Sequence, residues 1–240
     1  MELIRGQRSE LEKRAAKLIA DRMSALDHVM FGIVGGSSVN GIFIELLRHD
    51  IDWQKVHIFM VDERCVPIDS DESNFKGAHQ SFIRQLIAEG KMQESNVHPY
   101  HYNDIHEESS LVQYNEEFTQ VWEMADRDEE ARFDITLLSA GEDGHTASLF
   151  PGDETSGNGS IWRDEDGFIA IDNSPKPPAK RISTSRKLLE KTDFGILLFF
   201  GEGKRTALKN FLDDNVSLNE CPVKIVQHMN DAYVLTDIEG

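Results

Sequence analysis

The sequence predicts an α/β fold in which a largely parallel sheet is covered by helices on both faces. Short, nearly continuous apolar runs alternate along the chain with longer segments whose apolar residues recur at helical spacing. Strands that are apolar throughout are typical of parallel sheets buried on both faces. With 240 residues the chain is long enough for a substantial core, and we expect residues 1–240 to form a single α/β domain.

Each expected strand and helix follows from a local pattern. The first helix is expected to begin at a capping box of Ser9 and Glu12 and to bury the face that carries Leu11, Ala15 and Ile19. The other segments follow from the same reasoning. Strands are expected at residues 29–34, 56–61, 133–138, 195–200, 223–226 and 233–235, and further helices at 42–47, 75–87, 111–124 and directly after residue 204.

Charge and hydropathy exclude several classes of function. The formal net charge of −18 disfavours a nucleic-acid partner, because binding to phosphates needs a basic face. The longest apolar run, residues 196–200, is far shorter than the roughly 20 residues that span a bilayer. We therefore expect no nucleic acid and no membrane as partners. The partner is expected to be a small molecule; charge and hydropathy do not fix the oligomeric state, for which a monomer or small homo-oligomer is the expectation.

Cysteine usage points to the compartment. Cys65 and Cys221 match no disulfide framework and no metal-ligand spacing, and the N-terminal residues form no apolar signal region. Two reduced thiols are expected in a reducing compartment, which predicts a cytoplasmic location.

Positive charge is concentrated in one segment of this acidic chain. Residues 176–209 contain nine Lys or Arg and three acids. Such an asymmetry can focus a favourable field for anions at one site. Two amphipathic helices with solvated basic faces would give the same composition, and the count alone leaves both interpretations open.

Four unusual polar segments each follow a predicted strand, at residues 35–37, 62–64, 141–145 and 201–204. The carboxyl ends of parallel strands meet at one edge of the sheet, and ligands of open α/β sheets bind outside that edge. We therefore expect these four segments to converge on an active site.

Two of these segments have residues that suit an anion. Gly35, Gly36 and Ser37 are expected to open a helix directly after a strand, where exposed amides and the helix dipole favour phosphate. The planar fork of Arg64 matches two phosphate oxygens. A purely structural turn and a structural ion pair remain open as alternatives for these residues.

His145 is the candidate general base. Its flanking glycines place it in a turn that is expected to enter a short helix, whose N-terminus favours a neutral imidazole able to accept a proton. Asp143 is close enough in sequence to orient the ring. A nucleophilic Ser148 is the alternative, but the chain contains no G-x-S-x-G elbow.

No metal is expected. The calcium-loop-like segment that starts at Asp69 has Asn74 and Gln80 where such loops need Gly and Glu. The histidines near residue 100 match no zinc spacing.

Together these segments resemble the 6-phosphogluconolactonase family. The similarity runs from about residue 30 to the C-terminus, and EDGHTASLFP is its most specific part. The matching segments are VGGSS at 34–38, DWQKVHIFMVDERCVP at 52–67, DESNF at 71–75, LLSAGEDGHTASLFPG at 137–152, NSPKPPAKRIS at 173–183 and GEGK at 201–204.

The resemblance implies a Rossmann-like fold shared with sugar-phosphate isomerases and deaminases. It implies hydrolysis of 6-phospho-D-glucono-1,5-lactone to 6-phospho-D-gluconate without a metal or organic cofactor. His145 would activate water with Asp143 beside it. The residues that would bind the phosphate or other substrate oxygens are Gly35, Gly36, Ser37, Arg64, Arg181 and Lys204.

Two departures and two alternatives accompany the resemblance. Ser38-Val39 stands where the family usually has Thr-Pro, and Ser139-Ala140 where it usually has Gly-Met. An amino-sugar phosphate deaminase or isomerase is one alternative, but such enzymes typically have Tyr at the position of Arg64 and an acid at that of Phe150. The other alternative is a non-catalytic sugar-phosphate sensor, which would bind its ligand without turnover.

Overall fold

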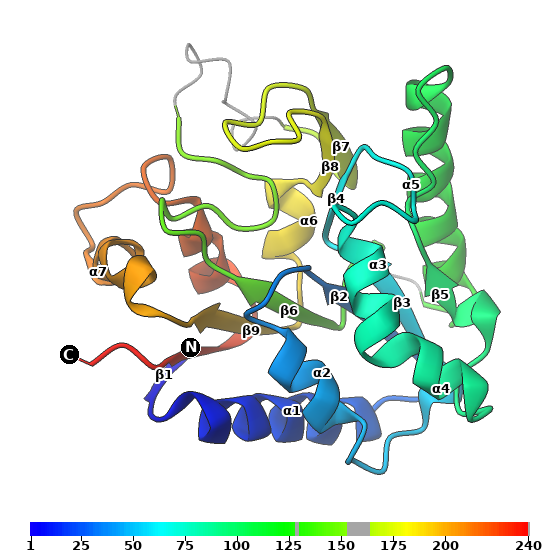
Figure 1. The fold of residues 1–240 in the computed structure, drawn as a ribbon, viewed down its shortest axis with the longest axis horizontal. Coiled ribbons are helices and arrows are strands. Elements are labelled where there is room, and N and C mark those ends of the chain that lie inside the picture. The colour runs from blue at the N-terminus through cyan, green and yellow to red at the C-terminus, as the bar shows by residue number, and fades with distance from the viewer. Residues whose placement is uncertain (128–129, 153–163, 240) are drawn as a thin grey trace.

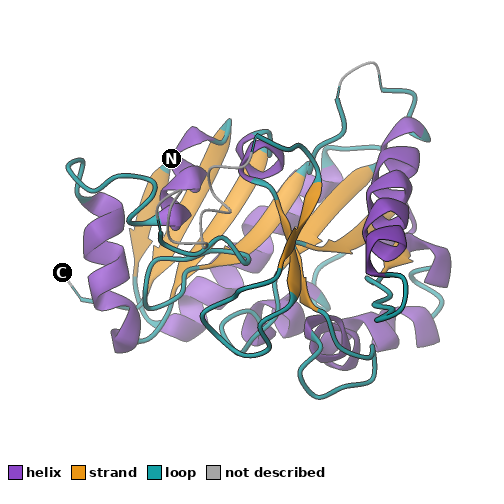
Figure 2. Ribbon diagram, turned by 90° about the horizontal axis from the view of Figure 1, so that it is seen from above, coloured by secondary structure: helices purple, strands orange, loops and turns teal. Residues whose placement is uncertain are grey.

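The fold is built on a seven-stranded, entirely parallel sheet with the strand order β1-β10-β9-β6-β2-β3-β5 (Figures 1 and 2). It is seen in a computed structural model that describes residues 1–127, 130–152 and 164–239. The strands of this sheet are β1 (Glu2–Arg5), β2 (Val29–Ile33), β3 (Val56–Met60), β5 (Val97–His98), β6 (Ile135–Ser139), β9 (Phe194–Phe199) and β10 (Asp231–Thr236).

A second, three-stranded antiparallel sheet lies beside the main one, with the strand order β4-β8-β7 (Figure 1). Its strands are β4 (Asp62–Arg64), β7 (Phe168–Ile171) and β8 (Arg181–Thr184). Because β4 follows β3 after a single residue, the chain passes directly from the main sheet into this smaller one.

Helices complete the structure. A π-helical turn at His79–Ile83 joins two of them into one continuous segment. The helices are α1 (Arg8–Ser24), α2 (Asn40–Leu46), α3 (Asn74–Ala78), α4 (Arg84–Ala88), α5 (Glu107–Glu123), α6 (Arg186–Glu190) and α7 (Arg205–Leu212).

Both faces of the main sheet are covered, because side chains along a strand alternate between the two faces. On β2, Phe31 and Ile33 belong to the cluster that contains Phe43 of α2 and residues of α1. Met30, whose side chain points to the opposite face, belongs to a second cluster, which contains Phe118 of α5. This arrangement confirms the predicted α/β class and the helices on both faces.

Five of the six predicted strands are present, and the sixth is wrong. Residues 223–226 lie in a 3₁₀ segment, Pro222–His228, that begins with a proline. The run Pro222–Val226 is short and has one polar residue, Lys224, whose side chain is also buried, so the sequence pattern did not separate a strand from a helical turn. None of the helices among the described residues is both long and apolar enough to cross a membrane.

The predicted capping box is also wrong. Helix α1 begins at Arg8, and its N-cap residue Gln7 makes no side-chain capping bond. Ser9 lies inside the first turn, and the carboxylate of Glu12 accepts a bond from Arg8 Nε at 2.9 Å instead.

A column of histidines lies on β3 and its neighbours. The rings of His28 and His57 stack with centroids 4.7 Å apart, and His57 Nδ1 lies 3.0 Å from His98 Nε2. His98 Nδ1 in turn lies 2.7 Å from Glu117 Oε1. Burial, reinforced by the charges of His28 and His98, lowers the pKa of His57 to about 4.

This pKa predicts a loss of stability in mild acid. Because the folded state binds a proton on His57 less readily than the unfolded chain, the contribution of His57 to stability is complete above pH 6.5 and is lost as the pH falls toward 4. Between pH 7 and pH 5, the free energy of unfolding should fall by about 1–2 kcal/mol more in wild type than in His57→Gln. Urea unfolding at both pH values measures this difference. His101→Gln, at an exposed histidine, is the control, and equal losses in wild type and His57→Gln would contradict the prediction.

Candidate active site

The four predicted polar segments meet at the carboxyl edge of the main sheet. A pocket of about 240 Å³ opens there. Three of the segments line it directly, and Lys204 of the fourth is hydrogen-bonded to two of the lining residues. The lining residues are Val34, Gly35, Gly36, Ser37, Ser38, Asp62, Arg64, Asn74, Ser139, Ala140, Gly141, His145, Ala147 and Arg181.

His145 and Asp143 form the expected pair. Asp143 Oδ1 is hydrogen-bonded to Nδ1 of His145 and accepts the backbone N–H of the same residue at 3.2 Å. Burial acts to raise the pKa of the Asp143 carboxyl, but the bonds from His145 and the charge of Lys176 outweigh it and hold that pKa below its usual range. The carboxylate therefore stays charged and holds the imidazole in one orientation.

The turn that presents His145 differs from the prediction. No helix follows it in residues 146–152, where the described segment ends: Thr146 and Leu149 form an isolated antiparallel bridge, and Ala147 has a φ of +52°. A helix dipole therefore does not act on the imidazole. Gly141 leaves the space that the imidazole occupies. A Cβ at this position would lie 2.0 Å from His145 Nδ1.

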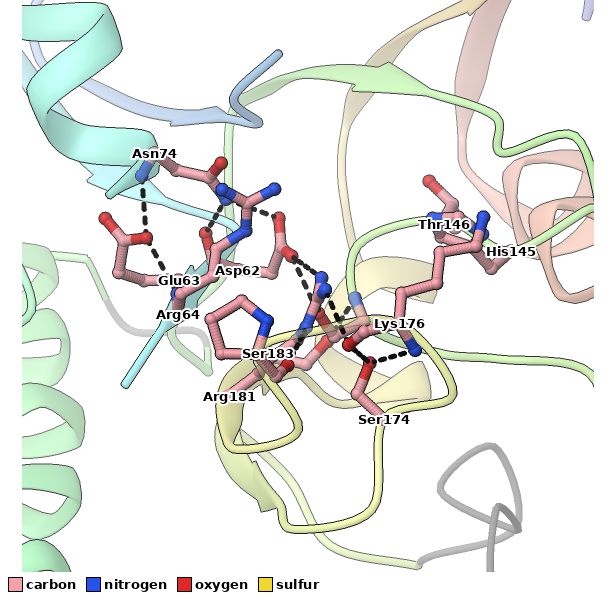
Figure 3. Close-up of polar contacts among 12 residues, drawn as sticks. Asp62, Glu63, Arg64, Asn74, His145, Thr146, Ser174, Lys176, Arg181 and Ser183 are labelled. Carbon is pink, nitrogen blue, oxygen red and sulfur yellow. Dashed lines mark hydrogen bonds and ion pairs between the residues drawn. The ribbon is translucent and has the colours of Figure 1, made fainter. Parts of the chain in front are cut away.

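Phe150 and Lys176 pack around the catalytic pair. The buried ring of Phe150 lies 4.7 Å from the His145 ring, and its other neighbour is Arg181, whose Cζ is 5.6 Å from the Phe150 centroid. Lys176 Nζ lies 3.4 Å from both His145 Nδ1 and Asp143 Oδ2, and Figure 3 shows the Lys176 side chain extending toward His145. An ammonium group thus lies beside the Asp143 carboxylate.

The glycine loop, residues 35–38, lies between β2 and α2. Gly36 has a φ of +100°, which only glycine adopts without strain. The prediction that this loop opens a helix directly is wrong, because α2 begins only at Asn40. The loop is instead linked to the fourth segment, where Lys204 Nζ donates to Ser38 Oγ at 3.0 Å and to Ser139 Oγ at 2.8 Å.

Lys204 is an unusual cation in this pocket. Burial, followed by the charge of Arg8, lowers the pKa of Lys204 to about 8, while Asp237 and Glu142 act in the opposite direction. An ammonium group has three N–H donors, and the two serines accept two of them. The third is available to a bound anion.

Two arginines lie directly opposite one another on the small sheet, because β4 and β8 pair with Arg64 in register with Arg181. Like charges in that position repel. Arg64 Nη1 donates to Glu72 O at 2.5 Å, and its buried Nε has no partner among the described residues. Both arginines line the pocket, so an anion bound there would offset their repulsion.

Arg181 is fixed mainly by the chain around it. Its Nη2 donates to the carbonyl oxygens of Lys176 and Pro177 at 3.1 and 3.2 Å, and its Nε donates to that of Pro178 at 3.1 Å. Its Nη1 lies 4.0 Å from Asp62 Oδ2 (Figure 3). The guanidinium therefore lines the pocket and also holds the loop that carries Lys176.

Buried carboxylates support this wall of the pocket. Asp62 Oδ2 accepts the hydroxyl of Ser148 at 2.7 Å, so the predicted alternative nucleophile is buried and engaged away from His145. Glu63 accepts the backbone N–H groups of Arg64, Asn74 and Phe75, which ties β4 to the start of α3. Burial raises the pKa of Glu63 in spite of these bonds.

The structure brings all the predicted site residues together. Asp143 and Lys204 are hydrogen-bonded to residues that line the pocket, and the other predicted residues line it directly: Gly35, Gly36, Ser37, Arg64, His145 and Arg181.

Sequence reasoning missed the supporting residues. Lys176 lies in the positively charged segment 176–209, next to two prolines, but neither feature indicated a contact with His145. Asn74 and Ser139 also line the pocket and were not predicted, whereas Asp62 belongs to the predicted segment 62–64 but was given no role there. Among the described residues, no group of three or more His, Cys, Asp or Glu could hold a metal ion.

Comparison with known proteins identifies the family. The model of the glucosamine-6-phosphate isomerase/6-phosphogluconolactonase family matches residues 3–235. The chain belongs to this family. One member, the 6-phosphogluconolactonase of Borreliella burgdorferi, is 34% identical over 88% of this chain and 85% of its own length. Another, the 6-phosphogluconolactonase of Mycobacterium tuberculosis, is 30% identical over 82% of this chain and 77% of its own length.

Solved structures of the family share the fold. The 6-phosphogluconolactonase of Trypanosoma cruzi has a TM-score of 0.79 at 22% identity, with 98% of this chain and 94% of that chain covered. A monomeric glucosamine-6-phosphate deaminase has a TM-score of 0.77 at 20% identity, with 98% and 97% covered. Because both activities occur on one fold, the fold alone does not separate them.

Proposed function

We propose that this chain hydrolyses 6-phospho-D-glucono-1,5-lactone to 6-phospho-D-gluconate, with His145 as the general base. One observation carries the proposal: the His145–Asp143 pair and the cationic, glycine-lined wall belong to the same pocket. A base and an anion site in one pocket can act on two ends of one small sugar phosphate. The names of the relatives at 30–34% identity agree with this reaction.

The reaction needs one proton acceptor. With Nδ1–H donated to Asp143, His145 Nε2 has the lone pair that can take a proton from water as its oxygen attacks the lactone carbonyl. The C1–O5 bond then breaks, and the proton passes to O5 as the ring opens. A lactone is already an activated ester, so a water activated in this way is sufficient and no nucleophilic serine is required.

The phosphate is assigned to the cationic wall. Lys204 offers its remaining N–H, Arg64 its guanidinium at the pocket wall, and the glycine loop its backbone. Charge-assisted bonds of this kind are stronger than neutral ones. These contacts hold the phosphate end of the substrate, and the lactone carbonyl carbon C1 stays accessible to the water at His145.

Replacing Asp143 with Asn should lower kcat by about 10- to 1,000-fold, because an amide no longer fixes the imidazole in the tautomer with a free Nε2. KM should change little, since Asp143 makes no proposed contact with the phosphate. Steady-state kinetics of the lactone measure both values, with Asp104→Asn, in an exposed and separate loop, as the control. An unchanged kcat would remove the orienting role from Asp143.

The substrate test compares three compounds with the wild-type protein. Lactone hydrolysis is followed as acid release, deamination of glucosamine 6-phosphate as ammonia release, and binding of 6-phosphogluconate by calorimetry. The proposal predicts rapid acid release and no ammonia. Ammonia release would favour the deaminase alternative, and binding without either reaction would favour the sensor.

We also place the protein in the cytoplasm. Cys65 and Cys221 are both free, and burial raises the pKa of their thiols to about 12 and about 11. Thiols that stay protonated are poor nucleophiles in disulfide exchange. This state fits a reducing compartment, and isolation of the native protein with both thiols reduced would test it.

A further inference from the structure

Arg8 contacts the glycine loop of the active site although it belongs to none of the four polar segments that were predicted to form that site. Strand β1 runs parallel to β10 and ends at Arg5, so the residues that follow leave the sheet at the carboxyl edge. Arg8 is the first residue of α1, and its side chain is 42% exposed. It therefore lies at the same edge of the sheet as the glycine loop and Lys204.

The guanidinium of Arg8 contacts both of these elements. Its Nη2 donates to the carbonyl oxygen of Ser37 at 2.9 Å, within the glycine loop. Its Cζ lies 5.3 Å from the centroid of Phe200, the buried residue that precedes the Gly201–Lys204 turn. Its Nε is held by Glu12 at 2.9 Å, which fixes the direction of the side chain.

Arg8 also acts on Lys204 through its charge. After burial, Arg8 is the largest influence that lowers the pKa of Lys204. Lys176 acts in the same direction, whereas Asp237 and Glu142 oppose it. The repulsion between Arg8 and Lys204 destabilises the empty pocket, and a bound dianion would offset it.

We propose that Arg8 is a positioning residue of the phosphate site, which fastens the glycine loop through the Ser37 carbonyl and adds a second positive charge beside Lys204. This inference rests on the proposed function, because it assigns the phosphate to the glycine loop and Lys204. It extends the site to the N-terminal helix, where Glu12 holds Nε of Arg8 while Nη2 donates to the glycine loop.

The test compares Arg8→Gln with Arg8→Lys and with Arg14→Gln, which removes the same charge from an exposed position on the same helix. Calorimetry with 6-phosphogluconate gives Kd at pH 7 and pH 9, and lactone kinetics at pH 7 give KM and kcat. At pH 7, Arg8→Gln should raise Kd and KM about tenfold and leave kcat within about twofold. Arg8→Lys should recover part of this loss, and Arg14→Gln should match wild type.

The pH dependence separates positioning from a general structural effect. Without Arg8, Lys204 keeps its proton to higher pH, so the ratio of Kd between Arg8→Gln and wild type should be smaller at pH 9 than at pH 7. A wild-type Kd in Arg8→Gln, or the same ratio at both pH values, would overturn the proposal. Wild type that binds 6-phosphogluconate but does not hydrolyse the lactone would instead overturn the proposed function, while the Kd comparison would still decide the role of Arg8.

Discussion

Replacing His145 with Ala should lower kcat for the lactone by a factor of roughly 10²–10⁴ while KM stays nearly unchanged. The imidazole is the only proposed proton acceptor, and it makes no proposed contact with the phosphate. Its side chain is 17% exposed at the pocket, so removal leaves space for water without disturbing the core. The loss should therefore fall on the chemical step.

Two further measurements make this result specific. Affinity for 6-phosphogluconate should be the same in wild type and His145→Ala, which shows that the anion site is intact. His101→Ala, at an exposed position, should have wild-type kinetics. An unchanged kcat in His145→Ala, or a change confined to KM, would remove His145 from the role of base.

Replacing Lys204 with Ala should have the second largest effect, a rise in KM of about 10- to 100-fold with kcat nearly unchanged. The ammonium group is bonded to both Ser38 and Ser139, so its loss removes a charge-assisted contact to the ligand and also loosens the glycine loop from β6. Steady-state kinetics separate the two constants. A loss in kcat alone would contradict the phosphate assignment.

The lowered pKa of Lys204 predicts the direction in which pH changes the affinity for the anion. The protonated form binds the anion, so in wild type the affinity for 6-phosphogluconate should decline as the pH rises through about 8. In Lys204→Arg the guanidinium stays charged, and this alkaline decline should disappear even if the affinity at pH 7 is lower. Calorimetry from pH 6.5 to pH 9.5 measures both profiles. Parallel profiles would show that another group titrates.

The convergence of the site could be predicted from the sequence because it depends on one general property of the fold. Polar residues after successive parallel strands must meet at one edge, and the segments at Gly35, Asp62, Gly141 and Gly201 do so. The short range of the Asp143–His145 contact also made that pair predictable.

Other features depended on contacts between distant parts of the chain. The pairing of β4 with β8 places Arg64 opposite Arg181, and no local pattern indicates this register. Arg8 reaches Ser37 across 29 residues of sequence. The helix expected after His145 failed for another reason, because Thr146–Leu149 closes into a bridged turn that residue spacing did not distinguish from a helical start.

The central claim is tested most directly by the decay of freshly generated 6-phosphoglucono-1,5-lactone, followed with wild type, with His145→Ala and without protein. The control without protein is necessary because this lactone also hydrolyses spontaneously. We predict that wild type accelerates the decay well beyond buffer and that His145→Ala returns it close to the spontaneous rate. Decay at the buffer rate with wild type would contradict the lactonase function, and equal acceleration by both proteins would contradict the role of His145.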